Sequence, residues 1–425
     1  MSAVKIFQKG AFVNEDSLWG ASAKSLAGDN AIPFLTLGKK KTVNLETDNS
    51  IDTQAFKDIP RKVTEYAEEN ISMYNRFSGL EPLMYWAWGF ETVNSVVVLS
   101  LQDDPTLTPD DVYLDSSSNE FTFLRTEELK DKGVVYVFSA DVAVVGTELT
   151  KELDTLTITE NSGLMYEHVF ELDRTERHVS DFKEDEKDVP GYYIGAKKNR
   201  LATVGVRVKP ETDLIYPKSI CKSFNFKTEA AAFSEWSFSF LSKDQLKGNF
   251  LSDNWNYASE VSSSDNIAIH HQMEVALGEN EDNLVKLGVT SAELSVEIPL
   301  PVDQDTTSGL NIIEPVMEGK YNISLNTVLS RYSTDIYQGY RDTWQSCQVR
   351  ISAMNDFYRT DIFAHKSKIS EAGPDEGDIP KENLQFEVGS FGASTWPKSL
   401  KGNLLIQNSP IVLRVRNYNS TNSML

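Results

Sequence analysis

The stretch Glu235-Trp236-Ser237-Phe238-Ser239-Phe240-Leu241 decides the fold class of this chain. Its large aromatic residues stand at every second position, and the residues between them are small or charged. Because successive side chains of a β-strand point to opposite faces, this alternation predicts a strand with one aromatic face and one wet face. Residues 223–227, just upstream, have a similar pattern, so the two segments are expected to form an extended hairpin.

Other segments along the chain also have the composition of strands. Apolar residues alternate with polar ones, or form short runs flanked by charge, in residues 42–46, 95–100, 166–172, 201–208, 292–298, 348–352 and 411–415. We therefore expect a mainly β protein, built from domains of the β-sandwich or β-barrel type.

Two short helices are expected among these strands. The first covers residues 80–90, with Ser78 and Glu81 spaced as a capping box, Pro82 in the first turn and Gly89 near the end. The second covers residues 334–344, where apolar residues share one helical face. Each helix is followed by a strand, so the two regions resemble one another.

Short matches in the same order in both halves predict an internal duplication. They pair Lys9-Gly10-Ala11-Phe12 with Lys247-Gly248-Asn249-Phe250, Trp19 with Trp255, Asp29-Asn30 with Asp265-Asn266, Leu37-Gly38 with Leu287-Gly288, and Asn70-Ile71-Ser72 with Asn322-Ile323-Ser324. We therefore divide the chain into a first β domain, residues 1–242, which carries the extra hairpin, and a second, residues 243–425.

Composition excludes several classes of function. The chain of 425 residues has a net charge of −22, and its hydrophobic residues, 40% of the total, suffice for packed cores. A protein that grips nucleic acid carries a basic patch, and the acidic balance points the other way. It favours either solubility or a surface that faces DNA without holding it. No apolar run is long enough to span a membrane, and the first residues do not read as a signal peptide.

No group of residues predicts catalysis, a cofactor or a metal. His270-His271 with Glu274 lack a third ligand, and Asp103-Asp104 with Asp110-Asp111 do not have the spacing of a calcium loop. Cys347, one of two cysteines, is expected to be a buried thiol. Motifs for hydrolases, metalloproteases and nucleotide binding are missing from the sequence, so we expect a protein that is not an enzyme.

Several segments resemble the major tail tube proteins of long-tailed, siphovirus-type bacteriophages, in the variety with two tube domains in one polypeptide. The similar segments are Leu35-Thr36-Leu37-Gly38-Lys39-Lys40-Lys41-Thr42-Val43, residues 78–91, Tyr166-Glu167-His168-Val169-Phe170-Glu171-Leu172, residues 200–206, residues 222–240, residues 308–315 and Arg331-Tyr332-Ser333-Thr334-Asp335.

The resemblance implies a structural subunit of the virion tail, assembled in the host cytoplasm. Chains would associate with copies of themselves in rings of three with pseudo-sixfold symmetry, or of six if one half alone lines the lumen, and the rings would stack into a tube. Tape-measure and terminator proteins would be further partners. Genome DNA would pass through an acidic lumen without specific binding, since a basic lumen would hold it.

Particular residues are candidates for these roles. Residues on the polar faces of the matched strands are expected to face the lumen, the alternative being outward exposure to solvent: Glu46, Glu293, Ser295 and Glu297. Aromatic residues of the two helices are expected to pack on the sheet and on a neighbouring subunit: Tyr85, Trp86, Trp88, Tyr340 and Trp344.

Two other functions remain open from the sequence. One is a different virion part, such as a tail terminator, a distal tail protein or a capsid decoration protein. The other is a carbohydrate-binding or adhesion β-sandwich, which would need its aromatic residues exposed in a groove.

Overall fold

The computed structural model describes a mainly β protein, as the alternating sequence pattern predicts. Within the described residues the strands pair antiparallel throughout, and two α-helices accompany them. The described residues are 9–15, 19, 21–22, 24–26, 31–37, 42–46, 61–100, 135–139, 164–172, 199–209, 212–248, 266–279, 283–301, 312, 314–315, 317, 320–330, 337–355, 358–374, 382–389 and 409–419.

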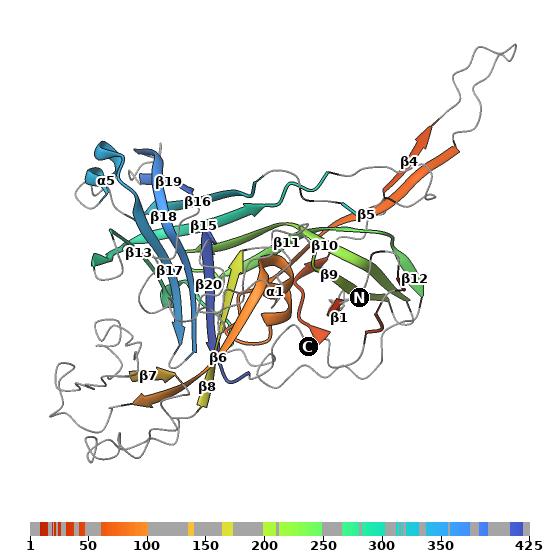
Figure 1. The fold of residues 1–425 in the computed structure, drawn as a ribbon, viewed down its shortest axis with the longest axis horizontal. Coiled ribbons are helices and arrows are strands. Elements are labelled where there is room, and N and C mark those ends of the chain that lie inside the picture. The colour runs from red at the N-terminus through yellow and green to blue at the C-terminus, as the bar shows by residue number, and fades with distance from the viewer. Residues whose placement is uncertain are drawn as a thin grey trace, which may run out of the picture.

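One wide sheet forms a layer of its own (Figure 1). Its strand order is β3–β5–β11–β10–β15–β16–β19–β18. The strands are β3 (Thr36–Leu37), β5 (Arg61–Tyr74), β11 (Glu235–Ser242), β10 (Thr212–Glu229), β15 (Val289–Glu297), β16 (Asn322–Leu329), β19 (Glu382–Val388) and β18 (Tyr358–Pro374).

The two longest strands, β10 and β18, leave this wide sheet and continue into two other sheets. The first part of β18 pairs in a second sheet, ordered β14–β13–β17–β18–β20–β8–β6–β7. Its further strands are β14 (Val285–Leu287), β13 (Met273–Gly278), β17 (Cys347–Asn355), β20 (Ile411–Asn417), β8 (Leu164–Leu172), β6 (Gly89–Ser100) and β7 (Val135–Ser139).

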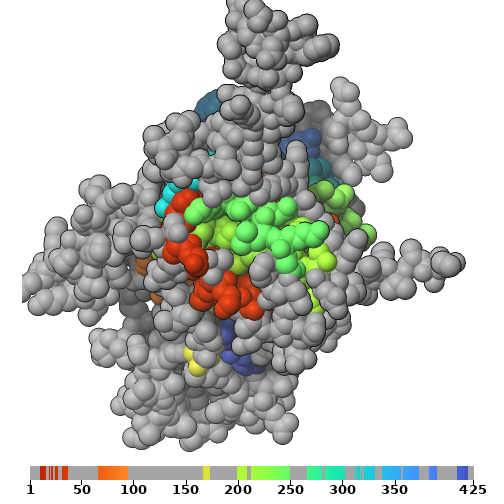
Figure 2. Space-filling model, turned by 90° about the vertical axis from the view of Figure 1, so that its right-hand side faces the viewer, coloured from red at the N-terminus to blue at the C-terminus, as the bar shows by residue number. Residues whose placement is uncertain are grey.

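The first part of β10 pairs in a third sheet, ordered β2–β1–β9–β10–β12. Its further strands are β2 (Ala31–Ile32), β1 (Lys9–Glu15), β9 (Leu201–Lys209) and β12 (Leu246–Gly248). Figure 2 shows part of this third sheet from outside, with red N-terminal segments beside the green segments of β10 and β12.

The core lies between the wide sheet and the other two, as in a β-sandwich. The alternation in β11 has the predicted result: Trp236, Phe238 and Phe240 are buried in this core, whereas Ser237 and Ser239 lie on the opposite face and are half-buried. Burying aromatic side chains of this size supplies a large share of the folding free energy.

Helix α1 (Glu81–Trp88) fills the interior of the sandwich. The ring of Trp86 is 5.3 Å from that of Phe12, and its indole N–H donates to the carbonyl of Ser219 at 3.0 Å. The ring of Trp88 is 5.3 Å from that of Phe224 in the wide sheet. One helix therefore contacts both layers, because its tryptophans point in different directions.

The ends of α1 follow partly from the sequence. Pro82 lies in the first turn, and Gly89 ends the helix with φ 101°, a left-handed conformation that favours glycine. The predicted capping box is wrong, since Leu80 is the N-cap, no side chain caps the helix, and Glu81 instead accepts a hydrogen bond from the backbone N–H of Gly79 at 2.7 Å.

The second helix, α5 (Gln338–Thr343), is shorter than predicted. It ends at Trp344, which is left-handed with φ 54°. Residues 334–336, the start of the predicted helix, lie outside the described residues.

The structure tests two of the sequence matches directly and overturns both. Leu37 lies in β3 and pairs with β5, whereas Leu287 lies in β14 and pairs with β13. Lys9 lies in β1 beside β9, whereas Lys247 lies in β12 beside β10. Each match rests on only two or three identical residues, which is too few to identify equivalent strands.

Another match falls in similar positions. Residues 70–72 of β5 and residues 322–324 of β16 each pair with an earlier strand on one side, β3 or β15, and residues from both segments belong to the wide sheet. The match of Trp19 with Trp255 lies outside the described residues, because Trp255 is not described.

A hairpin extends from the body of the molecule. Strand β4 (Thr42–Glu46) pairs with residues 61–66 at the start of β5, and in Figure 1 this pair points away from the three sheets. Within the described residues, no third strand joins it.

Candidate functional site, the polar face of the wide sheet

The wide sheet has one face in the core and one face lined by polar side chains, which we call the polar face. The pairing register places these residues opposite one another, strand after strand. The polar face comprises Thr36, Asn70, Ser72, Tyr74, Ser223, Asn225, Lys227, Glu229, Glu235, Ser237, Ser239, Ser291, Glu293, Ser295, Glu297, Asn322, Ser324, Asn326, Val328, Lys368, Glu371, Asn383, Gln385 and Glu387.

The composition of this face is mostly neutral and polar, with an excess of carboxylates. It contains six glutamates against two lysines and no arginine among the described residues, so its formal charge is 2 − 6 = −4. All of its side chains are exposed or half-exposed. The polar face therefore offers hydroxyl and amide groups to water and few cations to an anion.

The charges at the centre of the face interact. The Asn225 side-chain amide donates to Oε1 of Glu293 at 2.5 Å, and Nζ of Lys227 is 2.9 Å from Oε2 of Glu229. The hydrogen bond with Glu229 raises the pKa of Lys227, and Glu293 and Glu235 add to the rise. The local potential around the lysine is therefore negative, even though Lys227 itself is a cation.

The structure brings three of the four proposed lumen residues together. Glu293, Ser295 and Glu297 are on the polar face, at successive outward positions of β15. Glu46 is elsewhere, because β4 pairs with β5 in the projecting hairpin and not with the strands beside β15. Sequence matching aligned β4 with β15, whereas the actual neighbour of β5 in the wide sheet is β3.

The aromatic residues proposed for contacts between subunits fall into two groups. The side chains of Tyr85, Trp86 and Trp88 are buried within the chain itself, which leaves them little or no surface for a neighbouring subunit. That part of the prediction is corrected, and their packing on the sheet is retained. In the second helix, Tyr340 is half-buried against the core, and Trp344 is 66% exposed.

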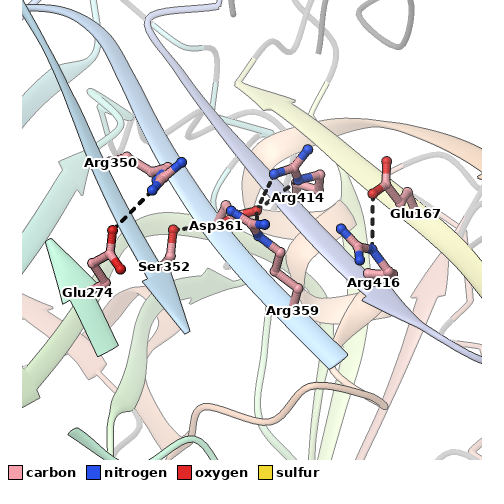
Figure 3. A network of polar contacts seen from close by, with 8 residues as sticks. All are labelled: Glu167, Glu274, Arg350, Ser352, Arg359, Asp361, Arg414 and Arg416. Atoms are coloured by element: carbon pink, nitrogen blue, oxygen red, sulfur yellow. Dashed lines mark hydrogen bonds and ion pairs between the residues drawn. The ribbon is translucent and has the colours of Figure 1, made fainter. Parts of the chain in front are cut away.

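A buried network of charges lies on the second sheet, on the face opposite the core (Figure 3). Asp361 Oδ2 accepts hydrogen bonds from Arg359 Nε at 2.6 Å and from Arg414 Nε and Nη2 at 2.8 and 2.6 Å. The Ser352 hydroxyl donates to Oδ1 at 2.6 Å. The guanidinium of Arg414 also lies 5.3 Å from the centre of the Phe363 ring.

Two further ion pairs flank this cluster. Arg416 Nε donates to Glu167 Oε1 at 3.1 Å, and Arg350 Nη2 donates to Glu274 Oε1 at 3.1 Å. These partners come from distant parts of the sequence and from neighbouring strands of the second sheet. No short motif links them, so the sequence alone gave no signal of this network.

The network controls the ionisation of its members. Burial by itself would raise the pKa of Asp361, but the charges of Arg359, Arg414 and Arg350 and the hydrogen bond from Ser352 hold that pKa well below its usual range. Burial lowers the pKa of Arg416 to about 10, opposed by Glu167. These arginines are already paired with carboxylates inside the protein, which makes them structural groups and not a site for an external anion.

The remaining candidate ligands and nucleophiles have ordinary structural surroundings. His270 and His271 lie in a 3₁₀ turn, and His270 Nδ1 is 2.9 Å from the Thr228 hydroxyl. Cys347 is buried as predicted, and burial raises the pKa of its thiol to about 12. Among the described residues, no three His, Cys, Asp or Glu side chains gather as a metal site would require.

Comparison with known proteins adds no relative, since no protein-family model and no curated protein matches this chain.

The helices in the described part of the chain are too short to cross a membrane. The acidic residues Asp103-Asp104 and Asp110-Asp111 lie outside the described residues, as does the Lys39-Lys40-Lys41 run.

Proposed function

We propose that this chain is the subunit of a bacteriophage tail tube, and that the polar face of the wide sheet lines the lumen through which genome DNA leaves. The observation that carries the proposal is the composition of that face. It is broad, has few cations and carries carboxylates such as Glu293 and Glu297 on a central strand.

The electrostatics of such a surface suit a conduit. Duplex DNA carries about one negative charge per 1.7 Å of its axis, and arginine and lysine contacts hold it by releasing counterions. A surface of hydroxyls, amides and carboxylates makes few such contacts and repels phosphates within a Debye length of roughly 8 Å at physiological salt. DNA would therefore slide past without being retained, while the arginines of the second sheet stay paired in the protein interior.

The projecting hairpin supports self-assembly. A two-stranded hairpin alone is marginally stable in water, and β4 with the start of β5 has no third strand among the described residues. Contact with another copy of the chain would supply the missing cover. The exposed Trp344 is a second surface of this kind, since a large aromatic side chain gains from burial against a neighbour.

Among the described residues, the adhesion alternative loses several of the aromatic side chains on which it depended. It required tryptophans and phenylalanines in an open groove, and Trp86, Trp88, Trp236 and Phe238 are buried. A tail terminator, distal tail or decoration protein would share much of the fold, so copy number in purified virions separates those from a tube subunit, which is abundant.

Charge reversal on the polar face tests the proposal. We expect Glu293→Lys with Glu297→Lys to leave tubes visible by negative-stain electron microscopy and to slow genome ejection at low salt, with recovery as salt rises. The matched control reverses two exposed acidic residues that lie off the face, Glu279→Lys with Asp342→Lys, so the net charge of both double variants rises by four. Equal ejection rates for the two double variants and the wild type would refute the lumenal assignment.

A further inference from the structure

The two halves of the chain have the same order of strand pairing. The pairing places the end of the first half after β12, at residue 248 and not at residue 242. In this first half β1 pairs with β2 and β9, β9 with β10, β10 with β11 and β12, and β5 with β3 and β11. In the second half β13 pairs with β14 and β17, β17 with β18, β18 with β19 and β20, and β16 with β15 and β19. Helix α1 follows β5, as α5 follows β16. Strands β4, β6, β7 and β8 are additional in the first half.

The halves are joined to one another in the wide sheet by a single ladder. Residues 223–229 of β10, in the first half, pair antiparallel with residues 291–297 of β15, in the second. In this ladder Phe226 is opposite Leu294, and both side chains are fully buried. The contact is therefore a complete edge-to-edge interface between one half and the other.

The corresponding edges at the two ends of the wide sheet lack a partner strand among the described residues. The counterpart of β10 is β18, whose residues 368–374 pair with β19 on one side. The counterpart of β15 is β3, which pairs with β5 on one side. An unpaired edge offers backbone N–H and C=O groups to another strand, so these two edges are complementary.

The pairing register identifies which residues correspond. Ser72 is opposite Thr36 as Ser324 is opposite Ser295, so Leu35 occupies the place of Leu294. Leu294 is 0% exposed, whereas Leu35, next to the open edge, is 37% exposed. Leu294 is covered by β10, whereas the equivalent Leu35 is partly exposed at the edge of β3. This difference is expected if Leu35 is covered by a strand of another chain.

We infer that the chain is internally duplicated and that β18 of one copy pairs antiparallel with β3 of the next copy, as β10 pairs with β15 within the chain. By correspondence with Asn225 opposite Ser295 and Phe226 opposite Leu294, Lys368 lies opposite Thr36 of the next chain, and Ile369 lies opposite its Leu35. This inference rests on the proposed ring-forming function and names the surface that closes the ring.

The consequence is a closed wide sheet. The interface is heterologous, because β18 of each chain meets β3 of the next, and such contacts close into a ring if the rotation permits. With two equivalent halves per chain, three chains give a ring with pseudo-sixfold symmetry. The polar faces of successive chains then join without an open edge, because Thr36 and Lys368 both belong to that face.

Paired cysteines test the contact directly. In the full-length chain, Lys368→Cys with Thr36→Cys should form disulfides between chains under mild oxidation, giving covalent dimers and trimers, and none larger, on a non-reducing gel. The control Glu387→Cys with Thr36→Cys stays monomeric, since Glu387 is one strand further from the edge. Asn225→Cys with Ser295→Cys tests the same geometry inside one chain and should link without a change in mass. The native thiols of Cys221 and Cys347 are buried and do not compete.

Electron microscopy of the same samples distinguishes the possible failures. Tubes or rings without linked chains would overturn the β18–β3 contact and leave the proposed function standing. Wild-type protein that forms neither rings nor tubes when concentrated would overturn the proposed function and the contact with it.

A second variant covers the case in which the cysteine pair disturbs assembly. Leu35→Glu should leave the single chain folded by circular dichroism and reduce the fraction in rings about tenfold or more, because it places a carboxylate in the interface. Leu246→Glu, at a similarly exposed leucine in β12, is the matched control. Normal assembly of Leu35→Glu would refute the inference.

Discussion

Replacing Asp361 by asparagine should destabilise the protein by far more than its small change in shape suggests. The side chain of Asp361 is fully buried, and it is hydrogen-bonded to Arg359 and Arg414, whose side chains are 3% and 2% exposed. Asparagine keeps the size of the side chain but removes the negative charge. Two buried guanidinium groups would then lack their common counterion, and breaking a buried ion pair in this way costs about 3–5 kcal/mol.

The assay is urea unfolding of the unassembled chain at neutral pH, followed by tryptophan fluorescence. Lys227→Gln is the control, because it breaks an ion pair whose side chains are 53% and 59% exposed, and such pairs are worth less than about 1 kcal/mol. A loss for Asp361→Asn no larger than that of Lys227→Gln would refute the account of the network as a charge-balanced unit.

The dependence on pH gives the same prediction an independent check. Since the pKa of Asp361 is lowered in the folded protein, its contribution to stability is present above the unfolded value of about 3.9 and is lost as the pH falls further toward the folded value. The wild-type protein should therefore lose this contribution below about pH 4, whereas Asp361→Asn has none to lose. Parallel acid profiles for the two proteins would contradict the assignment.

Two further predictions concern the tryptophans and a histidine. Trp86→Ala should reduce the free energy of unfolding by about 3–5 kcal/mol, because the indole is fully buried. Trp344→Ala should change that free energy little and should instead reduce assembly of the chains into rings. Equal losses of stability in the two variants would refute the placement of Trp86. Burial lowers the pKa of His365 to about 4, and Gln348 Nε2 lies 3.1 Å from its Nδ1. The unfolded chain therefore binds a proton first, and stability should fall from about pH 6.5 toward pH 4 by up to about 1.4 kcal/mol per unit. In His365→Gln this slope should be reduced, and an unchanged slope in urea titrations would show that His365 does not cause it.

Part of the candidate site was predictable because its signal is local. The alternation in β11 and β15 specifies which residues share a face, since the strand period of two is a property of the backbone. Glu293, Ser295 and Glu297 were therefore identified from their own strand. Glu46 was grouped with them through a match between strands, and that match failed because Leu37 and Leu287 pair with different kinds of neighbours.

Sequence by itself determined that the protein is mainly β, that β10 and β11 form a hairpin, and that the first helix ends at Gly89. These features follow from the strand periodicity, from the alternation of aromatic residues and from the ease with which glycine adopts a left-handed conformation. Each of these signals acts within a few residues of the chain. Tertiary structure alone decided that Trp86 and Trp88 are enclosed between two layers. It also assembled Asp361 with Arg414 and Ser352, and left Leu35 at an open edge of the wide sheet. These features depend on which strands become neighbours, and strand pairing joins residues far apart in the chain through backbone groups that are the same in every residue.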